Sequence, residues 1–347
     1  MEALSDLDGR LLDLIQEQIP LVSRPYAALG DMLGASEAEV IGRIAALKAG
    51  HGGGRGVIRQ IGAIFDSKSL GYQTTLVAAR IEASKLEAAA ALINEHPGVS
   101  HNYQRDHAYN LWYTLAVPPD SALGIDGTLS ALHKLSEAAA TRPMPTLKLF
   151  KIGVKLNLSG KNHPAAPTFG PEQQREAMSH AVTERDRELI RVLQRDLEAT
   201  AEPFDAPARE AGVSVGELLE AAKVFQSQKR MRRFSAVLRH RELGFEANGM
   251  GVWVVPAEKQ DEFGRIAAGF SAVSHCYLRP SYEDWPYNIF TMIHAQKRSE
   301  GEEILRQISA ATGVSRYDAL YSTREFKKVR VRYFTGEIEA WEKAHAP

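Results

Sequence analysis

The sequence predicts an α+β protein in which one structural unit occurs twice in tandem. The first observation is a polar signature that is present twice, as His101–Arg105 (HNYQR) and His275–Arg279 (HCYLR), each preceded by Val-Ser. The second is a wider repeat, in which residues 59–72 match residues 232–245 without a gap. The third is a stretch rich in Pro and Gly, residues 158–180, which has the composition of a linker. The chain therefore consists of two copies of one unit.

Composition indicates a protein of several small domains and gives no reason to expect binding to membranes or nucleic acids. The 347 residues are 44% hydrophobic and carry a net charge of −1 at pH 7. The N-terminus lacks the cationic and apolar blocks of a secretion signal, and no apolar run reaches membrane-spanning length. The single cysteine, Cys276, excludes an internal disulfide, and we expect it to be a small buried hydrophobe. We therefore expect a cytoplasmic protein without membrane partners.

Each copy begins with a pattern typical of a helix-turn-helix. Apolar residues at helical spacing follow Asp6 in copy one and Thr183 in copy two, and both residues are suitable helix caps. A Gly turn followed by a Ser-capped helix comes next, at residues 34–36 and 212–214. In copy one the glycine-rich stretch 51–56 is expected to form a wing.

The second part of each copy alternates strands and helices. In copy one, the expected strands cover residues 72–81, 99–106, 109–117 and 146–156, and the expected helices cover residues 84–95 and 123–140. Copy two repeats this pattern, with strands near residues 249–255, 273–279, 286–293 and 315–333. The order βαββαβ is typical of a ferredoxin-like sandwich, an antiparallel sheet with both helices on one face. The predicted domains are two winged helix-turn-helix domains (1–60 and 181–240), two ferredoxin-like domains (61–157 and 241–347) and a linker (158–180).

This combination of domains resembles the Lrp/AsnC family of transcription regulators, which implies DNA binding. A recognition helix needs basic or amide side chains at its exposed start, where they meet phosphates and base edges. Here the candidate helices begin with residues 36–39 (SEAE) and 214–217 (SVGE), and Glu220 follows one turn on. Because acidic groups repel a DNA duplex, we expect the helix-turn-helix to serve as scaffold, with no specific DNA as partner.

Longer phrases are similar to the siroheme decarboxylases, which are Lrp/AsnC-like proteins of heme biosynthesis. The phrases are residues 59–66, 98–107 with 109–112, and 273–280 with 284–288. The likeness covers nearly all of both halves, and the chain resembles a fusion of the two partner subunits in which the family usually occurs. The resemblance implies that two acetate side chains of siroheme lose carbon dioxide and become methyl groups. The product, didecarboxysiroheme, would supply d-type heme or an alternative route to heme b.

The duplicated signature supplies chemistry that suits this reaction. In a β-strand, two-residue alternation places the His, Tyr and Arg of each pentapeptide on one face. Loss of a carboxyl group leaves electron density on the side-chain carbon, and a histidine can deliver the required proton near neutral pH. The expected roles are proton donor or ligand of the substrate iron for His275 and His101, support for Tyr277 and Tyr103, and carboxylate clamp for Arg279 and Arg105. A structural hydrogen-bonding ring is the competing interpretation of each histidine.

Siroheme is an iron macrocycle rimmed with carboxylates, so its pocket should combine aromatic walls with several cations. Copy two supplies candidate substrate-binding cations in Arg232, Arg233, Arg239 and His240, whereas Lys327 and Lys328 are expected at the surface. A solvated basic face is the competing interpretation of Arg232 and Arg233. Further candidates are His107 as an additional donor, and Tyr282 and Trp285 as walls of the macrocycle site or as residues that close a hairpin. Because copy one has fewer cations, we expect the better-equipped site in copy two.

Two other functions remain compatible with the sequence. One is a heme-responsive regulator of the same fold, and the other is a tetrapyrrole-binding protein without catalytic activity. No nucleotide loop, zinc spacing or serine-nucleophile elbow occurs, so no cofactor beyond the iron tetrapyrrole substrate is expected. The expected partners are siroheme, its decarboxylated product and a second copy of the chain, joined as a homodimer through the ferredoxin-like sheets. The order of the two decarboxylations is left open.

Overall fold

The computed structural model describes residues 4–50, 56–152, 178, 180–239, 247–295 and 297–345. The chain forms two compact units, and each unit contains parts of both copies. The helical unit comprises Met1–Leu70 and Lys155–Gly244, and the sheet unit comprises Gly71–Val154 and Phe245–Pro347. Within the described ranges, no helix combines the length and the apolar character needed to cross a membrane.

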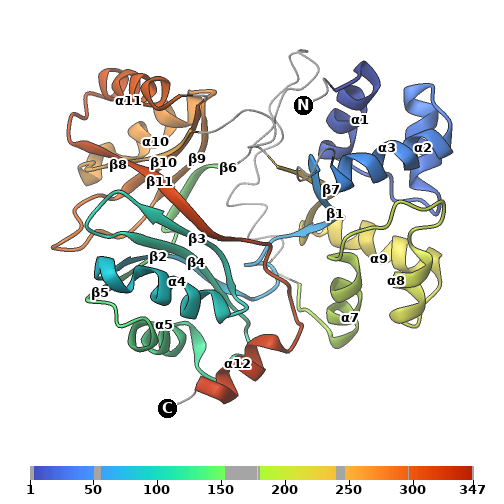
Figure 1. Cartoon of the computed structure of the whole chain (residues 1–347), viewed down its shortest axis with the longest axis horizontal. Helices are drawn as coiled ribbons and strands as arrows, with labels where there is room; N and C mark the ends of the chain where they lie inside the picture. Colours follow the sequence, from blue (N-terminus) through green and yellow to red (C-terminus); the bar gives the residue numbers. More distant parts are fainter. Residues whose placement is uncertain are drawn as a thin grey trace. The chain divides into compact units, whose positions relative to one another are not determined.

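The helical unit contains the two predicted helix-turn-helix motifs (Figure 1). Its helices are α1 (Asp6–Glu17), α2 (Pro25–Leu33) and α3 (Glu37–Ala49) in copy one, and α7 (Glu184–Leu193), α8 (Asp205–Glu210) and α9 (Val215–Ser227) in copy two. Gly34 and Gly212 have φ of 72° and 63°, a left-handed conformation that glycine adopts without steric cost. Ser36 and Ser214 then cap α3 and α9, each accepting a hydrogen bond from the backbone three residues on. The predicted turns and the caps Ser36, Thr183 and Ser214 are confirmed, whereas the predicted cap Asp6 is wrong, because Ser5 caps α1 and accepts a hydrogen bond from the Asp8 backbone.

A two-stranded antiparallel sheet joins the two copies inside the helical unit. Its strands are β1 (Ile58–Phe65) and β7 (Met231–Leu238). Because β1 pairs with β7, the whole of β1 belongs to the helical unit, beyond the domain boundary that the sequence suggested at residue 60. The proposed wing lies outside the described residues except for Gly56, and the proposed linker does so except for Met178 and His180.

The sheet unit is built on one nine-stranded antiparallel sheet with the order β5-β2-β4-β3-β11-β8-β10-β9-β6. The strands are β2 (Gln73–Arg80), β3 (Val99–Arg105), β4 (Leu111–Val117), β5 (Ala140–Met144), β6 (Lys148–Ile152), β8 (Ala247–Trp253), β9 (Val273–Leu278), β10 (Ile289–Ala295) and β11 (Tyr317–Lys328). The helices are η1 (Ala83–Lys85), α4 (Leu86–Glu95), α5 (Gly124–Leu135), η3 (Ala257–Lys259), α10 (Gln260–Gly269), α11 (Arg298–Thr312) and α12 (Glu337–His345).

Each half of this sheet has the predicted ferredoxin-like arrangement. The strand orders β5-β2-β4-β3 and β11-β8-β10-β9 are equivalent, with β5 beside β2 in the first half and β11 beside β8 in the second. Helices α4 and α5 cover one face of the first half, and α10 and α11 cover one face of the second (Figure 1). On the face without helices, a third core brings residues of both halves together, including Trp112, Trp285 and Phe290. The fold class predicted from the sequence is confirmed.

The end of copy one differs from the prediction. The helix expected over 123–140 ends at Leu135, and Glu137 has φ of 49°, which turns the chain away from the helical path. The residues that follow form two short strands, β5 and β6, where the sequence suggested one strand. Pro143 fits in β5 because this strand lies at the edge of the sheet, where one side needs no ladder hydrogen bonds.

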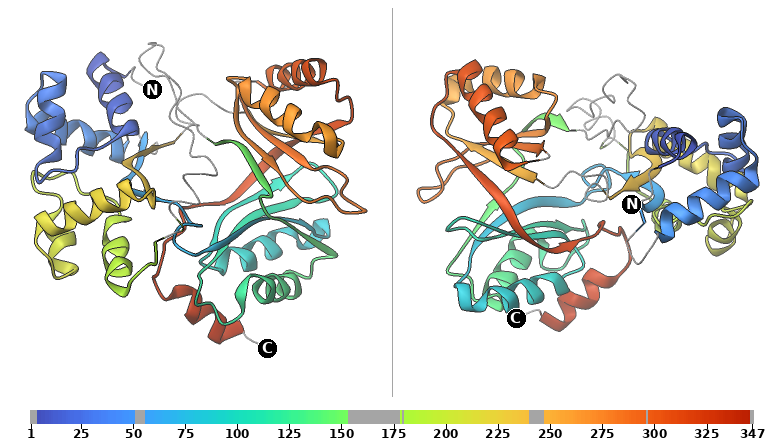
Figure 2. Two further views of the ribbon diagram at one scale, coloured as in Figure 1. Left: turned by 180° about the vertical axis from the view of Figure 1, so that it is seen from behind. Right: turned by 45° about the horizontal axis from the view of Figure 1, so that its top comes forward.

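The two halves exchange their last strands. From copy one, β6 pairs with β9, and from copy two, the second part of β11 pairs with β3. Figure 2 shows the long β11, in red, running from one half of the sheet to the other. Each exchanged strand carries a lysine that forms a hydrogen bond to the other half. Lys151 Nζ donates to the Phe270 carbonyl at 2.9 Å, and Lys327 Nζ donates to the Asn94 carbonyl at 2.5 Å. These carbonyls lie at the ends of α10 and α4, where a cation is favourable.

Lys327 is therefore not the simple surface residue that the sequence suggested. It is partly buried, and this burial lowers the pKa of its ammonium group. Sequence reasoning missed this role because the carbonyl acceptors are more than 200 positions away in the chain, at a separation of 233 residues for Asn94.

Candidate active site

The two pentapeptides lie on equivalent strands, β3 and β9, and turn the same side chains away from the helices. Val99 and Asn102 face α4, since Val99 packs in that core and Asn102 Nδ2 donates to the Ala90 carbonyl at 3.3 Å. Cys276 likewise packs beneath α10, and burial raises the pKa of its thiol to about 12. The expectation of a small buried hydrophobe at Cys276 is confirmed. The intervening His, Tyr and Arg side chains lie on the helix-free face.

We call these side chains the His101 row (His101, Tyr103 and Arg105) and the His275 row (His275, Tyr277 and Arg279). In the first row, the His and Tyr ring centroids are 6.2 Å apart, and in the second they are 5.9 Å apart with the rings stacked. All four rings are partly buried. Three strands, β11, β8 and β10, separate β3 from β9 in the sheet. Each half therefore has its own row.

A serine in a β-bulge holds each histidine. The strand register shifts at Ser100, between Val99 and His101, and at the equivalent position in β9. Ser100 Oγ lies 3.0 Å from His101 Nδ1, and Ser274 Oγ lies 2.8 Å from His275 Nδ1. Sequence reasoning did not assign the two serines to the site, although the duplicated Val-Ser was a signal that could have identified them.

The arginines of the rows are deeply buried. Arg105 and Arg279 are only 7% and 9% exposed, and burial lowers the pKa of both guanidinium groups to about 10. Arg105 Nη1 donates to the Leu320 carbonyl at 2.8 Å, and Arg279 Nη1 donates to the Met144 carbonyl. The Nε of each is buried, and the described residues provide no hydrogen-bond partner for it. Each row therefore contains a buried cation that stays charged at neutral pH.

No carboxylate neutralises these two cations within the described part of the chain. Arg279 instead lies over the Tyr277 ring at 4.7 Å, and Arg105 lies 6.0 Å from the centroid of Trp112. A buried charge without a counterion is costly, so its presence in a fold calls for a functional reason. The positive charge favours an anionic group at the helix-free face. Direct clamping of carboxylates by these two arginines stays a prediction.

The strands beside the two rows give them different surroundings. At positions paired with the His and Tyr, the His101 row has Thr114, Trp112, Lys328 and Glu325, and the His275 row has Met292, Phe290, Ile152 and Leu149. The His101 row is therefore flanked mainly by polar and charged residues, whereas the His275 row is flanked by apolar residues. Lys328, which the sequence suggested as a surface residue, is partly buried and pairs in register with His101.

The other predicted cations of copy two belong to the helical unit, whereas His275 belongs to the sheet unit. Arg232 forms an ion pair with Asp66, which is almost fully buried. Burial lowers the pKa of Arg233, and Arg239 donates to the backbone carbonyl of Ile58 at 3.1 Å and to that of Gly56. His240 lies outside the described residues. The expectation that these groups enrich the His275 row thus gains no support from the structure, and their role in substrate binding stays a prediction.

The remaining candidates belong to the aromatic core on the helix-free face of the sheet. Trp285 is fully buried, and its ring lies 5.2 Å from that of His107. Burial lowers the pKa of His107, whose Nδ1 accepts a hydrogen bond from Tyr109 N at 3.0 Å. Tyr282 and Trp285 form an isolated β-bridge. This geometry supports the second of the two roles suggested for Tyr282 and Trp285, closure of the hairpin.

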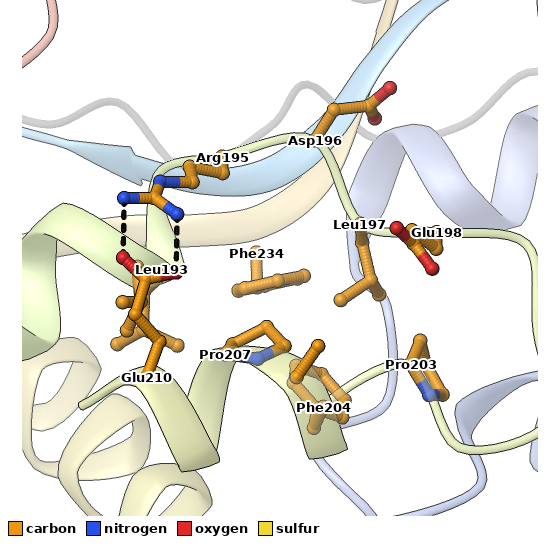
Figure 3. Close-up of a pocket in the computed structure, with 12 residues that line it drawn as sticks. Leu193, Arg195, Asp196, Leu197, Glu198, Pro203, Phe204, Pro207, Glu210 and Phe234 are labelled. Carbon is orange, nitrogen blue, oxygen red and sulfur yellow. Dashed lines mark hydrogen bonds and ion pairs between the residues drawn. The ribbon is translucent and has the colours of Figure 1, made fainter. Parts of the chain in front are cut away.

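The described residues contain no group of three or more His, Cys, Asp and Glu side chains placed to hold a metal. A cavity of about 240 Å³ lies in the helical unit, between Phe204, Phe234 and an Arg195–Glu210 ion pair with contacts of 2.6 and 2.7 Å (Figure 3). Its described lining contains none of the predicted site residues.

Family models match most of the chain. Residues 8–59 match a siroheme decarboxylase NirDL-like HTH domain, and residues 69–151 and 242–327 match an AsnC-like ligand binding domain.

Full-length and half-length relatives were both found. A siroheme decarboxylase of Hydrogenobacter thermophilus is 36% identical, and the alignment covers 96% of each chain. A siroheme decarboxylase beta subunit of Methanosarcina barkeri is 43% identical over 42% of this chain and 97% of its own length. An alpha subunit of the enzyme of Desulfovibrio desulfuricans is 42% identical over 45% of this chain and 87% of its own length. These matches agree with the interpretation of the chain as a fusion of two subunits.

Solved structures of siroheme decarboxylases also match the chain over almost its full length. The crystal structure of the siroheme decarboxylase NirDL matches with a TM-score of 0.76 at 33% identity, covering 98% of both chains. A second crystal structure of NirDL, in complex with an iron-uroporphyrin III analogue, matches with a TM-score of 0.74 at 33% identity and the same coverage. The duplicated rows, the duplicated fold and the full-length matches together show that this chain belongs to the siroheme decarboxylase family.

Proposed function

We propose that the chain is a carboxy-lyase that removes the carboxyl groups of two acetate side chains of siroheme as carbon dioxide. The observation that carries this proposal is the duplicated His-Tyr-Arg row. Each imidazole lies on the helix-free face, and the same row contains a buried guanidinium that no carboxylate of the described residues neutralises. The NirDL complex with an iron-uroporphyrin III analogue supports a tetrapyrrole ligand for this family. The heme-responsive regulator and the non-catalytic binder are not favoured.

The reaction needs a proton and no external electrons. The bond between the methylene carbon and the carboxylate breaks, its electron pair stays on the methylene carbon, and a proton added there gives the methyl group. Histidine suits this delivery near neutral pH, and the cations of the rows suit the carboxylates of the substrate. We therefore expect no cofactor beyond the iron tetrapyrrole itself, with His275 as a further candidate ligand of its iron. The product is didecarboxysiroheme, expected to enter d-type heme or heme b synthesis.

Mass spectrometry of the product tests the proposal. Purified protein incubated with siroheme under anaerobic, reducing conditions and without added cofactor should give a product lighter by two carbon dioxide units. A matched reaction without protein controls for spontaneous loss. Unchanged siroheme in the presence of folded protein that binds it would refute decarboxylation and favour a carrier.

A second prediction concerns DNA, because the fold is shared with DNA-binding regulators. The first turns of α3 and α9 contain acidic residues, and in α9 Glu217 closes a capping box by accepting a hydrogen bond from Ser214 N at 2.8 Å. The acidic groups therefore stabilise the helix starts at the positions where a DNA reader needs cations. We expect only weak, salt-sensitive binding to duplex DNA. Selection of a sequence bound with nanomolar affinity at physiological salt would contradict this expectation.

The assembly of the protein also belongs to this proposal. We expect a homodimer through the ferredoxin-like sheets, and sedimentation equilibrium of the full chain would distinguish a monomer from a dimer.

A further inference from the structure

The serine beside each histidine has different neighbours in the two rows. In the His275 row, Ser274 Oγ lies 2.8 Å from His275 Nδ1 and donates to the Met292 carbonyl at 3.3 Å. A carbonyl oxygen only accepts, and a hydroxyl has a single hydrogen. Both contacts can be hydrogen bonds only if Ser274 Oγ donates its hydrogen to the Met292 carbonyl and accepts a hydrogen bond from His275 Nδ1–H. This row therefore places the ring hydrogen on Nδ1 and leaves a lone pair on Nε2.

The His101 row has a hydroxyl at the position that Met292 occupies in the other row. Thr114 Oγ1 accepts from the backbone N–H of His101 at 3.1 Å and lies 2.7 Å from Ser100 Oγ. Ser100 Oγ in turn lies 3.0 Å from His101 Nδ1. Among the described residues, Ser100 is the sole side-chain partner of the Thr114 hydroxyl. The Thr114 hydroxyl can therefore act as a hydrogen-bond donor only by donating to Ser100 Oγ. Ser100 then donates to His101 Nδ1, and the ring hydrogen lies on Nε2.

We infer that the bulge serines, with Thr114 in one row only, hold the two histidines in opposite tautomers and so assign them different roles. His275, with Nδ1 bonded to Ser274 as a donor, can gain and release a proton at Nε2 without losing that bond. His101, with Nε2–H fixed, is a neutral hydrogen-bond donor for a carboxylate. Ser100, Thr114 and Ser274 are positioning residues, because they act through the histidines. The assignment of roles rests on the proposed decarboxylation, whereas the assignment of tautomers rests only on the hydrogen bonds described above.

The surroundings of the rows agree with this division. Lys328, in register with His101, adds a cation where a carboxylate is to be held. The His275 row instead has Met292 and Phe290 beside it, and apolar neighbours weaken the solvation of a reacting carboxylate. Loss of carbon dioxide moves the negative charge of the carboxylate onto the methylene carbon as an electron pair, and this carbon takes the Nε2 proton of the protonated His275 ring. The resulting neutral ring is the Nδ1–H form that Ser274 holds, and solvent restores the proton.

Nitrogen NMR of the substrate-free full chain tests the tautomers without reference to catalysis. Long-range ¹H–¹⁵N spectra of protein labelled in histidine distinguish Nδ1–H from Nε2–H rings at a pH where both are neutral. The His101→Gln and His275→Gln variants assign the two signals. We expect Nε2–H for His101 and Nδ1–H for His275. The same tautomer in both rings, or the reverse assignment, would overturn the inference.

Two matched variants test the cause of the difference. Thr114→Val removes the hydroxyl at nearly constant shape and should release His101 from a fixed Nε2–H form, whereas Thr114→Ser should retain it. Met292→Thr introduces a hydroxyl into the other row and should move His275 toward Nε2–H. In each spectrum the ring of the unaltered row serves as a folding control. An unchanged His101 tautomer in Thr114→Val would overturn the role of Thr114.

A kinetic comparison then tests the roles. With siroheme as substrate, Ser274→Ala should lower kcat by about 10-fold or more, because His275 loses the acceptor that fixes its proton. Thr114→Val should act mainly on KM. Absence of turnover in the wild-type chain would refute the proposed function and leave the NMR result intact. Turnover with the reverse pattern of kcat and KM would refute the assignment of roles alone.

Discussion

Replacing His275 by glutamine should lower kcat for siroheme by about 10²–10⁴-fold, the range expected when a general acid is removed. Glutamine can still form hydrogen bonds in the His275 row, but it cannot carry a proton. Binding should change little, because the buried Arg279 remains in the same row. Initial rates of carbon dioxide release and a separate titration with siroheme would separate kcat from affinity.

The matched variant is His101→Gln, which should affect KM more than kcat. His101 has the same strand position but a different neighbour, Thr114, and it lies in register with Lys328. The sequence led to the same ranking of the two histidines through Arg232, Arg233 and Arg239, which the structure places in the other unit. Equal losses of kcat in the two variants would refute the asymmetry, and a larger loss at His101 would reverse the assignment.

Replacing Arg279 by methionine should weaken siroheme binding by about 1.5–3 kcal/mol, the range for a hydrogen bond to a charged group. This corresponds to about 10- to 150-fold in Kd. The guanidinium is buried and its Nε has no hydrogen-bond partner among the described residues, so a bound carboxylate would supply its counterion. Methionine fills a similar volume, and removal of an uncompensated buried charge is often neutral or stabilising. We therefore expect weaker binding without a lower free energy of unfolding.

Arg324→Met is the control for this variant. Arg324 pairs with Glu87 of α4 on the helix-covered face, and its side chain is 54% exposed. Its loss changes the net charge by the same amount and should leave the Kd for siroheme nearly unchanged. If both variants weaken binding equally, the effect comes from net charge, and the proposed role of the buried cation is wrong.

The alternation of residues in the sequence was enough to predict the shared face of each row. It was not enough to predict how Val99 packs under α4 while His101 faces the other way, because a regular strand puts residues two positions apart on one face. The bulge at Ser100 resolves this conflict by adding a residue to the strand. Bulges depend on pairing with a neighbouring strand, and single-sequence periodicity does not contain that information.

Long-range contacts account for the rest of what the sequence did not reveal. Arg105 bonds to Leu320, 215 residues away, and Arg232 pairs with Asp66, 166 residues away. Runs of basic residues in a sequence therefore do not show which cations are available to a substrate. The exchange of β6 and β11 between halves is of the same kind, since each of these strands pairs with a strand of the other copy. The repeat itself depends on local sequence, so the strand order and the caps Ser36, Thr183 and Ser214 could be predicted.

The most direct test of the central claim compares the wild-type chain with a variant in which both His101 and His275 are replaced by glutamine. Each protein is first shown to be folded and to bind siroheme, and the mass of the tetrapyrrole is then measured after anaerobic incubation. The wild-type chain should release a product lighter by two carbon dioxide units, and the double variant should return unchanged siroheme. Full decarboxylation by the double variant at the wild-type rate would show that the two rows do not carry the reaction.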